Sequence, residues 1–167
     1  EAIIQGYEGR PEIRFSHKDD RAFYAPVADL ISVPDIKYFT SSSAFYRVLF
    51  HEMGHSTGHP KRLNRYDGMS NSYGDIPYSK EERVAELCSS FLAGIANLDL
   101  DIRNSAAYIG GWASALRDNQ KWVMWAAARA EKAADHILGN SSSFVPAEET
   151  TTEEVLNEVP VLEPVTE

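Results

Sequence analysis

The 167-residue chain has one cysteine, no long apolar run and no excess of basic residues. A lone cysteine, Cys88, cannot form an intrachain disulfide, which is typical of a reducing compartment, so we expect a cytoplasmic protein. No run approaches the roughly 18 apolar residues that a membrane-spanning helix needs, so we expect no membrane association. The chain begins at Glu1 with no apolar signal region after it, and we interpret it as a piece of a longer protein.

Most of the net charge of −9 belongs to the C-terminal end. The segment from Val145 to Glu167 holds seven Glu and no Lys or Arg, so the rest of the chain is nearly neutral. A nearly neutral body argues against a strongly basic surface for nucleic acid. Residues 140–167 are rich in Ser, Thr, Glu and Pro and offer little apolar surface to bury. We therefore expect one domain at 1–139 and an acidic disordered tail or linker at 140–167.

The N-terminal part of the domain carries the β-strand patterns. Short β-prone runs at 13–15 and 22–24 are separated by polar residues, which predicts a hairpin. A third run at 30–33 follows Pro26 and ends at Pro34. Together the three runs predict a small twisted antiparallel sheet.

The rest of the domain carries helical patterns, which makes the expected fold class α+β. Helices are predicted after the serines at 41–43, ending near Gly58, and at 79–97, 105–117 and 119–138. Ser79 followed by Glu82 matches a capping box, so both residues are expected to cap the second helix. Gly139 is expected to cap the last helix at its C-terminus.

The strongest chemical signal is His51-Glu52-Met53-Gly54-His55, an H-E-x-x-H sequence on the first predicted helix. Residues i and i+4 project from one face of a helix, so both imidazoles can reach one ion. Zinc suits imidazole ligands and lowers the pKa of a bound water to about 7. Glu52 can accept the proton of that water as a general base. The motif predicts one zinc ion in a peptidase-type site.

Two histidines leave a tetrahedral zinc site one protein ligand short. The longer metzincin pattern requires histidine at position 61, where this chain has Lys61, so that pattern is excluded. Glu86 is the favoured third ligand, because it lies on a helix face of small residues opposite the apolar stripe. His59 and the loop residue Asp75 remain alternatives. The tyrosines at 66, 73 and 78 could each steady an oxyanion, and the sequence does not choose among them.

Further segments extend the signal well beyond the zinc motif. They are Phe39-Thr40, Phe45-Tyr46, Leu49 to His55, Thr57 to His59, Arg62 to Arg65, Glu81 to Leu87, Ala106 to Ile109 with Trp112, and Lys132 to Gly139. On these segments the chain resembles, over residues 10–139, the metallopeptidase domain of ArdC-type antirestriction proteins, the polyvalent-protein metallopeptidase family.

This resemblance implies a zincin-like fold of the gluzincin kind, with His51, His55 and Glu86 as zinc ligands and Glu52 as the catalytic residue. It also implies carriage on mobile genetic elements and a preceding domain, absent from this chain, that binds single-stranded DNA. The first hypothesis is a zinc peptidase that hydrolyses a peptide bond of a protein or peptide substrate. The second is a zinc-stabilised binding module without catalysis. A third is a damage-sensing regulator that pairs H-E-x-x-H with a DNA-binding domain.

Overall fold

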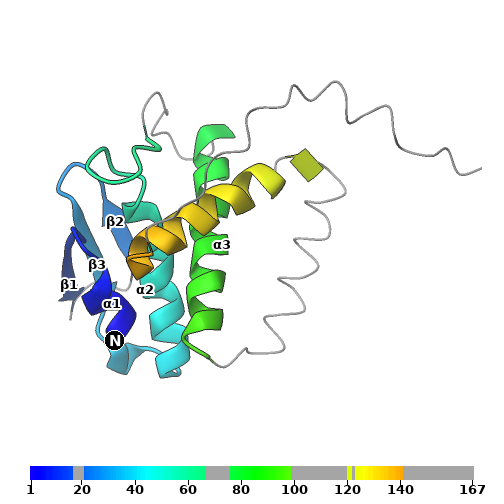
Figure 1. The fold of residues 1–167 in the computed structure, drawn as a ribbon. Helices are drawn as coiled ribbons and strands as arrows, with labels where there is room; N and C mark the ends of the chain where they lie inside the picture. Colours follow the sequence, from blue (N-terminus) through cyan, green and yellow to red (C-terminus); the bar gives the residue numbers. More distant parts are fainter. Residues whose placement is uncertain (17–20, 67–75, 99–119, 122, 141–167) are drawn as a thin grey trace, which may run out of the picture.

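The structure is a computed structural model that describes residues 1–16, 21–66, 76–98, 120–121 and 123–140 (Figure 1). Its labelled elements, in chain order, are α1 (Ala2–Gly6), β1 (Glu12–Ser16), β2 (Phe23–Ala25), β3 (Leu30–Pro34), the 3-10 helix η1 (Ile36–Tyr38), α2 (Ser42–Ser56) and α3 (Ile76–Ile95). Residues 120–121 and 123–138 are also helical, and we call them the C-terminal helix. The helix expected at 105–117, the tail beyond Asn140 and the boundary drawn between domain and tail lie outside what these residues can test.

The three strands form one mixed sheet in the order β1-β3-β2. β3 pairs in parallel with β1 and antiparallel with β2. The expected hairpin between the first two strands is therefore wrong, and so is the expectation of a purely antiparallel sheet. The α+β class is confirmed. The hairpin instead joins β2 to β3, through a turn in which the Asp29 N–H donates to the Pro26 carbonyl.

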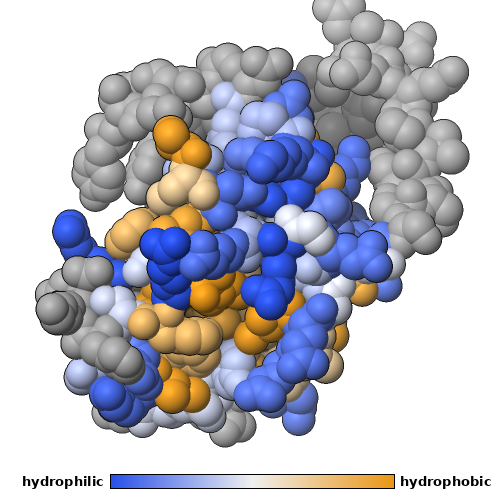
Figure 2. Space-filling view, turned by 90° about the vertical axis from the view of Figure 1, so that its left-hand side faces the viewer, coloured by the Kyte–Doolittle hydropathy of each residue, from blue (hydrophilic) through white to orange (hydrophobic). Residues whose placement is uncertain are grey.

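β3 takes the central place because its side chains are the most apolar of the three strands. Ile31 and Val33 are fully buried, whereas the edge strands expose Phe15 and Phe23. A strand buried on both faces is normally rich in apolar residues, and β3 is buried from Ile31 to Pro34 with Ser32 as its polar residue. Viewed from the side of the sheet, the molecule shows apolar side chains framed by hydrophilic ones (Figure 2).

Helix α2 begins where the sequence predicts and packs against the sheet. The Ser41 side chain accepts a hydrogen bond of 3.1 Å from the Ala44 N–H, which satisfies one of the free amides at the helix start. Phe45, Leu49 and Met53 recur at helical spacing and are buried. The helix ends at Ser56, just before Gly58, as expected.

Helix α3 begins at Ile76, three residues before its expected start. Pro77 therefore lies in the first turn, where a missing N–H costs nothing. Ser79 lies inside the helix rather than before it, so the expected capping box with Glu82 does not form. This shift leaves the Glu82 side chain available for another role.

The C-terminal helix completes the core over α2 and α3. Its alanines at 126, 130 and 133, together with Ile137, are fully buried in the same cluster as Leu49 of α2 and Leu92 of α3. Gly139 has a φ of +69°, and the Asn140 N–H donates to the Asp135 carbonyl. This is the glycine C-cap that the sequence predicts. Among the described residues, no helix is long and apolar enough to cross a membrane.

Candidate metal centre

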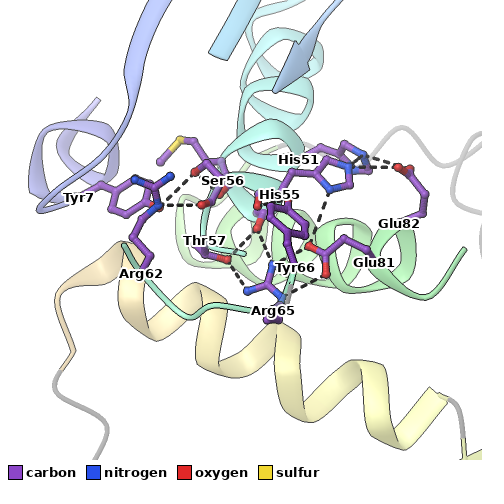
Figure 3. A network of polar contacts seen from close by, with 12 residues as sticks. Tyr7, His51, His55, Ser56, Thr57, Arg62, Arg65, Tyr66, Glu81 and Glu82 are labelled. Carbon is purple, nitrogen blue, oxygen red and sulfur yellow. Dashed lines mark hydrogen bonds and ion pairs between the residues drawn. The ribbon is translucent and has the colours of Figure 1, made fainter. Parts of the chain in front are cut away.

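The two histidines of the H-E-x-x-H motif lie on adjacent turns of α2 and point to one place (Figure 3). The Nε2 atoms of His51 and His55 are 3.1 Å apart. In a tetrahedral zinc site with Zn–N bonds of about 2.0–2.1 Å, two ligand nitrogens lie about 3.3 Å apart. The two imidazoles are thus already spaced as a pair of ligands to one ion.

The carboxylate that joins them is that of Glu82, on α3. Its Oε1 lies 3.2 Å from Nε2 of His55, and its Oε2 lies 3.5 Å from Nε2 of His51. Among the described residues, these three side chains form the one group whose ligand atoms, all within 4.8 Å of one another, could hold a metal ion. Two imidazoles and a carboxylate are the donor set of many catalytic zinc sites.

The structure places the other candidate ligands elsewhere. Glu86 lies one turn beyond Glu82, where it is exposed and lines a cavity beside His51 rather than joining the two imidazoles. His59 accepts a hydrogen bond from the Lys61 N–H through Nδ1 and is not part of the cluster. Asp75 lies outside the described residues. Glu86 was favoured from the sequence because the apparent capping box gave Glu82 another task, whereas the structure brings Glu82 rather than Glu86 up to the two imidazoles.

Glu52 is buried directly beside the cluster, with 8% of its surface exposed. Burial raises the pKa of its carboxyl above the ordinary value, while the nearby His55 and His51 oppose the rise. A carboxylate base is most effective when its pKa approaches the working pH. The position and environment of Glu52 suit a general base.

A second carboxylate, Glu81, lies behind His55. Its Oε1 is 3.8 Å from Nδ1 of His55, and Arg65 donates to both of its oxygens, at 3.1 and 2.6 Å (Figure 3). Burial by itself would lower the pKa of His55, but the Glu81 and Glu82 carboxylates outweigh it and raise that pKa to about 9. Carboxylates behind a histidine ligand commonly fix its orientation and tautomer.

Arg65 also ties this carboxylate to the end of α2. Its guanidinium donates to the Thr57 hydroxyl at 2.7 Å and to the Gly54 carbonyl at 3.0 Å. The sequence assigned no role at the metal centre to Glu81. Only the crossing of α2 and α3 brings Glu81 next to His55 and Arg65, so no local pattern in the sequence indicated this role.

The tyrosine at 66 has a structural contact in this arrangement. Its hydroxyl donates to the backbone carbonyl of His55, and burial raises the pKa of its phenol above the ordinary value. Its ring also lies so close to Gly58 that a Cβ there would come within 2.7 Å of it. Tyr73 and the side chain of Tyr78 lie outside the described part of the chain.

Comparison with known proteins agrees with this geometry. A family model described as zincin-like metallopeptidase matches residues 6–129. The DNA primase TraC of Escherichia coli is 38% identical over 137 residues, which cover 82% of this chain and 12% of TraC. The antirestriction protein ArdC of plasmid R388, in a Mn(II)-bound crystal structure, shares 36% identity with a TM-score of 0.64. That match covers 86% of this chain and 52% of ArdC, and the metal-free ArdC structure gives a TM-score of 0.63.

Two imidazoles, a carboxylate and a buried glutamate on crossed helices define a zincin-type centre. The chain belongs to the zincin-like metallopeptidase family found in ArdC-type antirestriction proteins. It spans about an eighth of the length of TraC and about half the length of ArdC.

Proposed function

We propose that this chain is a zinc-dependent peptidase domain of an ArdC-like antirestriction protein. The observation that carries the proposal is the convergence of His51, His55 and Glu82, with a separation of 3.1 Å between the two imidazole Nε2 atoms. Those three side chains would hold the zinc ion. The Mn(II)-bound structure of ArdC supports a metal-binding role for this family, and the imidazole pair favours zinc for this chain.

Bound zinc would polarise a substrate carbonyl and lower the pKa of a water molecule. Glu52 is the base that takes the proton from the attacking water, because its carboxylate is buried beside both histidines. Once protonated, the same carboxyl can donate the proton to the departing amide nitrogen. Glu81 holds His55 in place through its contact with Nδ1.

The class of substrate and the partner domain are proposed from the similarity to ArdC-type proteins. We propose a cytoplasmic protein substrate and a separate domain of the full-length protein that binds single-stranded DNA. The competing hypothesis of a zinc-stabilised binding module shares the same metal site and differs only in the role of Glu52.

Glu52→Gln separates these two functions, since it removes the base and leaves all three ligands in place. For the zinc-loaded protein we expect an unchanged ratio of zinc to protein and a fall in peptide cleavage of about 10²–10⁴-fold. Cleavage is measured on a synthetic degenerate peptide library, and antirestriction is measured in cells with the full-length protein. Full antirestriction by Glu52→Gln would refute the peptidase and favour the binding module.

A further inference from the structure

A cavity of about 390 Å³ opens beside the metal centre, on the N-terminal side of His51. His51 and Glu52 form one end of its wall, and Arg47 and Val48, one turn earlier on α2, continue it. From α3 the cavity is lined by Glu86 and by three small residues, Ser89, Ser90 and Ala93. The cavity therefore joins the reacting centre to a space large enough for one substrate side chain.

Arg47 is the polar group that this cavity leaves unsatisfied. Its Nε atom is buried and has no hydrogen-bond partner in the part of the chain that the structure describes. Among the described residues the Arg47 guanidinium has no carboxylate within ion-pair distance, and the Ser89 hydroxyl donates to the Arg47 backbone carbonyl rather than pairing with its side chain. Partly buried charges in proteins are usually paired, so an Arg47 side chain that lines the cavity without an ion-pair partner among the described residues indicates a ligand that carries the acceptor.

Glu86 gives the cavity a second charge, but at a different depth. Its side chain is exposed, whereas Arg47 is partly buried with its Nε fully covered. An exposed charge is screened by water and contributes little, whereas a desolvated one interacts strongly. The charge that selects the occupant is therefore the positive charge of Arg47.

We infer that this cavity is a substrate subsite in which Arg47 binds a carboxylate of the peptide next to the scissile bond. The inference rests on the proposed peptidase function and adds the chemical class of substrate. The carboxylate comes from an Asp or Glu side chain or from the C-terminus of the peptide. Small residues on α3 leave room for either, and the planar guanidinium suits bidentate binding of both.

The test compares zinc-loaded wild-type protein with Arg47→Gln and Arg47→Lys on degenerate peptide libraries. One library has an amidated C-terminus, and the other has a free one; cleavage sites are read by mass spectrometry. Matched peptides with Glu or Gln at the selected position then give the ratio of kcat/KM. We expect wild type to favour the carboxylate by at least about tenfold, which is the value of one charge-assisted contact. A preference confined to the free-terminus library identifies the C-terminal carboxylate as the source.

Arg47→Gln should bring the ratio to about one while keeping stoichiometric zinc, and Arg47→Lys should retain most of it. Glu86→Gln should change the preference far less than Arg47→Gln does, because the Glu86 charge is exposed to water. An unchanged preference in Arg47→Gln, or none in wild type, would overturn the subsite and leave the peptidase function standing. Failure of the zinc-loaded protein to cleave any peptide would contradict the peptidase function, and the subsite with it.

Discussion

Gly54 of α2 lies directly against Ala85 of α3, and a Cβ atom at Gly54 would be 3.1 Å from the Ala85 Cα and 3.2 Å from its carbonyl oxygen. The variable position of H-E-x-x-H before the second histidine is thus a point where the backbones of the two helices approach closely. Because backbone atoms cannot move aside as a flexible side chain can, this contact sets the separation of α2 and α3. It therefore sets the reach of Glu82 to the two histidines.

Substituting this glycine should damage stability and metal binding together. In Gly54→Ala the added methyl forces the helices apart, and we expect a loss of about 1–2 kcal/mol in the free energy of unfolding, with weaker zinc binding. Gly94→Ala is the matched control. Gly94 lies on α3, and a Cβ atom there would meet nothing within 4 Å. This control variant should gain about 0.5–1 kcal/mol from its lower unfolded-state entropy. Urea unfolding measures both, and equal effects would refute the contact.

The ion pair of Arg65 and Glu81 should be one of the costly contacts to break. Both side chains are more than 90% buried, and removing one partner leaves a buried charge uncompensated. We expect Arg65→Ala to lower the free energy of unfolding by about 3–5 kcal/mol. The double variant Arg65→Met, Glu81→Gln should recover part of that loss, because no charge is left unpaired. A loss below about 1 kcal/mol in Arg65→Ala would contradict the buried pair.

Much of the metal motif could be predicted from the sequence, because its spacing is local. The helix, its Ser41 cap and the facing of His51 and His55 all follow from residues within five positions of one another. The partners from α3 could not be predicted in the same way. The apparent capping box hid Glu82, and only Pro77 in the first turn hinted that the helix begins earlier.

The order of the strands in the sheet could not be predicted from local sequence patterns either. The parallel pairing of β1 with β3 joins strands that are separated by β2 in the sequence, and no turn signal marks such a pairing. Alternation of residues identified the strands, but it could not say which would be central. The burial of Ile31 and Val33 decided that, through packing against α2.

Metal binding should depend on pH through His55. Its pKa of about 9 in the metal-free protein means that it is protonated at neutral pH, so a metal ion must displace that proton. We expect the apparent affinity to rise by up to about tenfold per pH unit between pH 7 and 8.5, measured by competition with a chelator. Glu81→Gln should shift this rise to lower pH, since it removes one carboxylate that raises the pKa. A zinc affinity that does not change with pH would contradict the displacement of a proton from His55.

The raised pKa of His55 also determines the direction in which the stability of the metal-free protein changes with pH. A group whose pKa is higher in the folded state stabilises the fold below its unfolded value, about 6.5 for histidine, and loses that contribution as pH rises through the folded value. We therefore expect the metal-free protein to lose stability between about pH 6.5 and 9 through this group. Urea midpoints at several pH values measure the trend, and excess zinc should abolish it.

We propose that Glu82, on the turn before Glu86, completes the metal site with His51 and His55. Zinc titration of wild type, Glu82→Gln and Glu86→Gln tests it most directly, because the two variants make the same change one turn apart on one helix. We expect Glu86→Gln to bind one zinc ion nearly as tightly as wild type, and Glu82→Gln to bind it at least about a hundredfold more weakly, since losing a ligand should cost more than the roughly 10–100-fold lost with a residue that only orients one. Loss of zinc in Glu86→Gln with full binding in Glu82→Gln would contradict the claim.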